Sequence, residues 1–167
     1  MFLKNYTSSV PVSETINRIE KVLIRCGVSG ITKEYSGRNG EVAALTFHIK
    51  LEGTREVAIR LPADKERALE ALWLDYANGD ALSPDGKSVY GSPYKKKKRK
   101  DFADQAERTA WKIIQDWVEV QMSMIQMKQA DVVEVFLPYI WDTGSRTTLY
   151  GRLKTSGFKA LLPEKCE

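Results

Sequence analysis

Few side chains in this sequence are suited to acid–base, nucleophilic or metal chemistry. His48 is the only histidine, and the two cysteines are Cys26 and Cys166. These counts exclude a zinc site made of cysteine and histidine, and they leave little room for a histidine-dependent catalytic triad. We interpret His48 as a strand histidine that faces solvent or forms a hydrogen bond, because the sequence places no acid or nucleophile beside it.

Three carboxylates, Glu107, Asp116 and Glu119, fall within one expected helix. Di-metal sites in helical bundles pair such groups with histidine in a Glu-x-x-His motif, and this helix has no histidine. We therefore interpret these carboxylates as residues of a solvated helix face. The sequence predicts no catalytic residue, no metal site and no cofactor, and we expect a protein that is not an enzyme.

The net charge of +4 resides in one short tract. Residues 95–100 read Lys-Lys-Lys-Lys-Arg-Lys, and without them the chain has 20 basic and 22 acidic residues, a balance of −2. Six adjacent like charges repel one another and resist burial, which predicts a solvated loop or arm. Such an arm can displace counterions from a phosphate backbone. The same pattern is also typical of a solubilising loop and, in a eukaryotic protein, of a nuclear-import signal.

Aromatic residues lie close to this basic tract. Tyr90, Tyr94 and Phe102 flank it, and single strands are held by positive grooves with stacked aromatic rings. Arg108 and Lys112 continue the positive charge one and two turns into the following helix. The predicted nucleic-acid-binding residues are therefore Lys95, Lys96, Lys97, Lys98, Arg99, Lys100, Tyr94, Arg108 and Lys112.

A long amphipathic helix is expected from residue 101 to residue 129, a stretch without glycine or proline. Apolar positions recur there at spacings of three and four residues, at Phe102, Ala106, Thr109, Ile113, Trp117, Val120, Met124 and Met127. At about 1.5 Å per residue the helix would be about 40 Å long, which is more than one domain of this size needs. Core packing explains most of its apolar residues, but methionine also adapts to partner surfaces. We predict an oligomer or partner interface at Trp111, Trp117, Met124 and Met127.

The N-terminal half predicts a helix followed by a three-stranded antiparallel meander. Ser13 can cap a helix over residues 14–26, and Gly27 ends it. Three strands are expected, at residues 30–35, 42–51 and 57–61. In the last two, apolar and polar side chains alternate, and Asn39-Gly40 favours a tight turn between the first strand and the second. One face of this meander is apolar, and we expect the first helix to cover it.

The remaining pattern predicts helices separated by one insertion. Helical spacing covers residues 63–77, and residues 78–100 are rich in glycine, proline, serine and lysine. Asp131 as a cap and Pro138 as a terminator favour a short helix within residues 131–141, although the β-branched residues of this stretch leave a strand open. A last helix is expected over residues 147–156. The predicted fold is α+β, with a meander part over 1–77, a flexible basic insertion over 78–100 and a helical part over 101–167, together one compact domain.

The composition agrees with one domain that can bury a core, since the chain has 167 residues of which 43% are apolar. No apolar run approaches the roughly 18 residues that span a bilayer. The first residues also lack an apolar segment followed by a small-residue cleavage site, so we expect no secretory signal and no membrane partner.

Several stretches resemble small hypothetical proteins encoded by phages and prophages of bacteria. They are Thr7 to Ile16, Phe47 to Ala63, Gln105 to Trp111 and Glu134 to Tyr139, and the resemblance covers most of the chain except residues 78–94. It implies no activity and no site residues. What it implies is a setting, namely a mobile-element protein that acts in the cytoplasm of a bacterial host.

Charge and setting together predict a non-enzymatic nucleic-acid-binding protein of a phage or mobile element. Its basic arm would contact phosphates, and single strands are the expected ligand. The alternative is a protein-binding inhibitor or adaptor of a host machine, such as an anti-defence protein or a modulator of replication or transcription, acting through the long helix. In both cases we expect a homo-oligomer.

Overall fold

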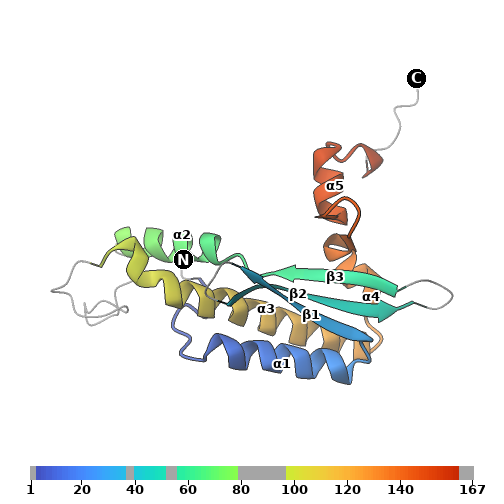
Figure 1. Cartoon of the computed structure of the whole chain (residues 1–167), viewed down its shortest axis with the longest axis horizontal. Helices are drawn as coiled ribbons and strands as arrows, with labels where there is room; N and C mark the ends of the chain where they lie inside the picture. Colours follow the sequence, from blue (N-terminus) through green and yellow to red (C-terminus); the bar gives the residue numbers. More distant parts are fainter. Residues whose placement is uncertain (1–2, 37–39, 52–55, 79–96, 162–167) are drawn as a thin grey trace. The chain divides into compact units, whose positions relative to one another are not determined.

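The computed structural model describes residues 3–36, 40–51, 56–78 and 97–161. It contains an N-terminal helix, a three-stranded antiparallel sheet and a helical C-terminal half, which confirms the predicted α+β class (Figure 1). The described chain forms two compact units. The first unit comprises Met1–Lys21 and Ala63–Glu119, and the second comprises Val22–Pro62 and Val120–Glu167, so the chain enters each unit twice. The division predicted at residues 78 and 100, within one domain, stays a prediction.

Helix α1, Val12–Arg25, has the apolar spacing that the sequence predicts. Its first turn closes with a hydrogen bond from the Thr15 amide to the Pro11 carbonyl oxygen at 3.1 Å. Ile16, Ile19 and Leu23 are buried, whereas Cys26 just beyond the helix is only half-buried. The helix stops where Gly27 adopts a φ of 81°, a left-handed conformation that glycine adopts without strain.

The three predicted strands form one sheet in the order β1-β2-β3, with β1 at Gly30–Ser36, β2 at Glu41–Lys50 and β3 at Glu56–Pro62. The register pairs Phe47 with both Ile31 and Ile59, so that apolar residues align across the three strands. Residues 37–39 of the predicted hairpin turn lie outside the described residues, and Gly40 has a φ of 67°.

The second face of the sheet is more covered than its alternating pattern predicts. Four consecutive residues of β2, from Ala44 to Phe47, are buried, although they alternate between the two faces. An ion pair between the two outer strands lies on the face of Thr46. Arg60 of β3 donates to both carboxylate oxygens of Glu34 in β1, through Nε at 2.8 Å and Nη2 at 2.8 Å, and the Thr46 hydroxyl donates to Glu34 at 3.1 Å.

The first unit has its own apolar cluster, formed by α2 (Lys65–Ala77), the 3₁₀ turn η1 (Arg99–Phe102) and the start of α3 (Ala103–Gln126). Asp64 caps α2 by accepting a hydrogen bond from the Arg67 amide at 3.0 Å. The buried members of the cluster are apolar and come from both helices and the turn; they are Ala68, Leu69, Leu72, Phe102, Ala106 and Ala110.

The long helix α3, Ala103–Gln126, buries one face near its start and another face from Trp111 onward. Near its start it buries the predicted stripe through Ala106 and Thr109. From Trp111 onward it buries a set that lies on roughly the opposite side at about 100° per residue, namely Trp111, Gln115, Val118 and Met122.

The rest of the predicted stripe on α3 is therefore partly exposed. The exposed fractions of Val120 and Met127 are 56% and 59%, and Trp117 and Met124 are half-buried. Trp111 is fully buried, so its predicted place in a partner interface is wrong. No observation tests that interface at Trp117, Met124 and Met127, and it stays a prediction.

The C-terminal half confirms the short helix within residues 131–141. Helix α4, Val132–Phe136, is capped by Asp131. The Asp131 carboxylate accepts a hydrogen bond from the Val133 amide at 2.7 Å, and the Asp131 amide donates to the Glu134 carboxylate at 3.3 Å. The 3₁₀ turn η2, Leu137–Tyr139, follows.

A small antiparallel ladder then forms between β4, Trp141–Asp142, and β5, Thr147–Thr148. The sequence missed this ladder because two residues are too few to show alternation. Helix α5, Leu149–Thr155, begins at the Thr148 cap, and the 3₁₀ turn η3, Lys159–Leu161, ends the described chain.

We expect Phe136→Ala to lower the free energy of unfolding by about 3–5 kcal/mol, because it removes a buried ring from a close-packed site. Phe136 packs edge-on against Phe47, with ring centroids 5.3 Å apart. The neighbouring Leu137 is 43% exposed, and we expect Leu137→Ala to cost less than about 1 kcal/mol. Urea denaturation of both variants measures the difference, and equal losses would contradict this description of the core.

Candidate functional site

The second half of the basic tract is held against α2. The Lys97 amide donates to the hydroxyl oxygen of Tyr76 at 3.1 Å, and Arg99 donates through Nη2 to Glu70 at 3.1 Å. The Lys98 amide then donates to Asp101 at 2.8 Å, which starts η1. Residues 97–100 are therefore attached to α2, while Lys98, Arg99 and Lys100 are exposed, as expected of a solvated tract. Tyr90, Tyr94, Lys95 and Lys96 lie outside the described residues.

The four described cations of the tract differ in their surroundings. The Lys97 ammonium lies 5.6 Å from the centroid of the Phe102 ring, and the Arg99 guanidinium is shared between Glu70 and, at 4.0 Å, Glu66. Lys98 and Lys100 are exposed. These two lysines are the described residues of the tract that are best placed to meet an anion from solvent.

Three aromatic rings pack together beneath the tract. The ring centroid of Tyr76 lies 5.8 Å from that of Trp73 and 5.3 Å from that of Phe102. Phe102 is buried and cannot stack on a base, whereas Trp73 and Tyr76 are only half-buried. The sequence pointed to aromatic residues within and just after the insertion. It missed Trp73 and Tyr76 because only the fold brings α2 beside the tract.

Arg108 and Lys112 serve contacts within the chain. Arg108 donates through Nε to the Ser8 carbonyl oxygen at 3.2 Å and through Nη2 to the Gln105 side-chain oxygen at 2.8 Å. Lys112 lies 3.0 Å from Asp116 and donates to Gln115 at 3.2 Å. Their predicted role as phosphate contacts does not fit these partners, so we leave both residues out of the proposed interface.

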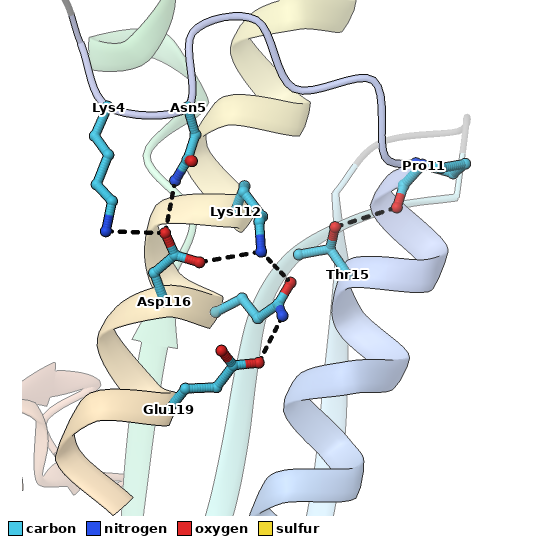
Figure 2. Close-up of polar contacts among 8 residues, drawn as sticks. Lys4, Asn5, Pro11, Thr15, Lys112, Asp116 and Glu119 are labelled. Carbon is cyan, nitrogen blue, oxygen red and sulfur yellow. Dashed lines mark hydrogen bonds and ion pairs between the residues drawn. The ribbon is translucent and has the colours of Figure 1, made fainter. Parts of the chain in front are cut away.

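Asp116 is the centre of the polar contacts that hold the N-terminal segment on α3 (Figure 2). It accepts from the Asn5 side-chain amide at 3.0 Å, and its carboxylate lies 3.0 Å from both the Lys4 and the Lys112 ammonium groups. The Thr109 hydroxyl also donates to the Asn5 carbonyl oxygen at 3.2 Å. Asp116 is therefore a structural anchor, in contrast to the solvated residue that the sequence suggested.

These contacts change the acidity of Asp116. Burial alone would raise the pKa of this carboxyl group, but hydrogen bonds from Asn5, Lys4 and Lys112, together with the charge of Lys112, lower it from 3.8 to about 2.

The predicted solvated position of Glu119 is also wrong, because its carboxylate accepts from Gln115 at 2.6 Å and is half-buried.

No protein-family model, curated protein or solved structure matches this chain. Within the described ranges, no three His, Cys, Asp or Glu side chains are grouped so that they could hold a metal ion. None of the described helices is long and apolar enough to cross a membrane.

We expect Asp116→Asn to lower the free energy of unfolding by about 1–2 kcal/mol at pH 7. Because the pKa of Asp116 is lower in the folded chain, its contribution is complete above about pH 4 and is lost as the pH falls toward 2. The variant should therefore lose stability less steeply than the wild type between pH 4 and pH 2. Denaturant titrations across this range measure both slopes, with Asp104→Asn, at an exposed position of α3, as control. Parallel curves for wild type and Asp116→Asn would contradict the anchoring role.

Proposed function

We propose that this chain binds single-stranded nucleic acid without catalysing a reaction. Lys98 and Lys100 contact phosphates, together with the other lysines of the tract at residues 95–100. The observation that carries the proposal is the attachment of this tract to α2 through Tyr76 and Glu70. A solubilising loop has no need of a fixed position, whereas a binding surface gains from one.

Attachment favours binding because an ordered segment loses less conformational entropy when it meets its ligand. Adjacent cations displace counterions from a phosphate backbone, and this release makes the affinity fall as salt rises. The half-buried rings of Trp73 and Tyr76 lie next to the tract and offer surfaces for base stacking. Charge beside aromatic rings supports a single strand as the ligand.

The setting is part of the same proposal. The resemblance to phage and prophage proteins points to a ligand present in the bacterial cytoplasm, either the nucleic acid of the mobile element or that of the host. The proposed activity needs no cofactor, because binding rests on charge and stacking alone.

Substituting glutamine at Lys98 and Lys100 should weaken binding to a labelled oligothymidylate about tenfold near 0.1 M salt. It should also make the dependence of log K on log salt shallower by about 1.4, since each single-strand phosphate contact contributes about 0.7. The matched control is the pair Lys21→Gln and Lys50→Gln, which removes the same charge from two other exposed positions. Fluorescence anisotropy over a salt series measures both quantities. An identical loss in the two double variants would show only the effect of net charge and would contradict the assigned surface.

Tyr76→Phe tests whether the position of the tract matters apart from its charge. This change removes the hydroxyl oxygen that accepts from the Lys97 amide, but it keeps every cation and an aromatic ring. We expect an affinity about two- to tenfold lower, since one hydrogen bond is worth about 0.5–1.5 kcal/mol, with the salt dependence nearly unchanged. Anisotropy measurements that match the wild type would mean that the tract binds as a free arm.

A second candidate function, binding to a host protein, is favoured by the apolar side chains that α3 leaves exposed. Val120 and Met127 are more than half exposed on the same stripe as Met124, an arrangement found at protein interfaces. A protein retained in stoichiometric amount after nuclease treatment of the native complex would favour this function. Loss of all partners on the same treatment would favour nucleic acid.

A further inference from the structure

A second concentration of positive charge occurs near the C-terminus. Residues 143–161 contain four basic residues and no acidic one. Together with the tract at 95–100 they hold 10 of the 26 basic residues of the chain, which leaves 16 basic against 22 acidic residues elsewhere. The excess of positive charge is therefore confined to two segments, residues 95–100 and residues 143–161.

This C-terminal segment is ordered although it has no core. It comprises the turn from β4 to β5, helix α5 and η3, coloured orange to red in Figure 1. None of residues 137–161 is buried. A backbone hydrogen bond from the Leu149 amide to the Ile140 carbonyl oxygen at 2.8 Å holds it to the preceding residues, and the Thr148 hydroxyl oxygen caps α5 by accepting from the Gly151 amide at 3.1 Å.

The segment is attached to the sheet of the second unit. Ile140 forms an isolated bridge with Ile59 of β3, and the guanidinium carbon of Arg60 lies 4.7 Å from the centroid of the Trp141 ring. Arg60 is itself fixed by its ion pair with Glu34. The hydrogen bonds from Arg60 lower the pKa of the Glu34 carboxyl group, although partial burial acts to raise it. The sheet thus fixes Ile140 and Trp141, the residues just before the segment, and so leaves an exposed segment in a defined position.

The side chains of the segment point to the chemistry of a partner. Arg146, Arg152, Lys154 and Lys159 are all exposed, and of these Arg152 lies 3.4 Å from Asp142, just outside the segment. Tyr150 is 51% exposed, with its ring centroid 6.0 Å from that of Phe158. Cations without neighbouring acids attract a polyanion, and an exposed tyrosine among them adds a surface for stacking.

We propose that residues 143–161 form a second phosphate-contacting surface for single-stranded nucleic acid, with Arg146, Lys154 and Lys159 as its cations and Tyr150 as its aromatic contact. This inference rests on the proposed function. An acidic protein would also satisfy the cations, whereas a single strand adds base stacking on the exposed ring of Tyr150, which lies between them in sequence. Nucleic acid is therefore the occupant that the observations favour.

The test is the triple variant Arg146→Gln, Lys154→Gln and Lys159→Gln in the full-length chain. With labelled oligothymidylate of 20 nucleotides, we expect the dependence of log K on log salt to become shallower by about 2, and the affinity near 0.1 M salt to fall more than tenfold. The control is Lys21→Gln, Arg25→Gln and Lys50→Gln, which removes three exposed charges from other elements. Where the triple variant melts at a lower temperature, the double variant Lys154→Gln and Lys159→Gln replaces it, with an expected change of about 1.4 in the slope.

The outcomes separate this inference from the function on which it rests. No binding of oligothymidylate by the wild type would overturn both. Normal binding by the triple variant, together with weakened binding by Lys98→Gln and Lys100→Gln, would overturn the second surface alone. Equal losses in the triple variant and its control would also overturn it, because net charge would then explain the effect. Tighter binding of polyglutamate than of oligothymidylate by the wild type, lost in the triple variant, would overturn it in favour of an acidic protein as the partner of this segment.

Discussion

The burial of Phe102 is the constraint on which the proposed interface depends. A run of like charges repels itself and resists burial, so its hydrogen bonds to α2 need an apolar contact beside them. Phe102 lies two residues after the tract and is 1% exposed within the apolar cluster of the first unit. Burying such a ring contributes about 1.5–3 kcal/mol. The exposed pair between Arg99 and Glu70 contributes less than about 1 kcal/mol and mainly sets the direction of the tract.

The sequence predicted the elements of this fold far better than the contacts between them. The spacing of Ile16, Ile19 and Leu23 and the Asp131 cap are local signals, and the structure confirms both. The apolar stripe of α3 misled because this helix is apolar on two sides, and only tertiary packing decides that Trp111 is buried while Val120 is exposed. The partners of Asp116 and Arg108 were equally hidden, since Asn5 and Ser8 are about a hundred residues away in sequence.

Two kinds of basic residue can be distinguished in this chain. Arg60, Arg108 and Lys112 have acids or carbonyl oxygens of the chain as partners, and they stabilise the fold. Lys98, Lys100 and the cations of residues 143–161 lie at exposed positions on ordered elements. Composition alone cannot separate the two kinds, because the partners of Arg108 and Lys112 are known only from the fold. The separation supports two surfaces for one class of ligand, each fixed by the unit to which it belongs.

The salt dependence of binding by the wild-type chain tests the central claim most directly. Anisotropy of a labelled 20-nucleotide single strand, measured from about 50 to 300 mM salt, gives the slope of log K against log salt. Four to six phosphate contacts predict a slope of about −3 to −4. A slope near zero, or no binding at the lowest salt, would contradict the account, because the exposed cations of this chain would then have no part in recognising a polyanion.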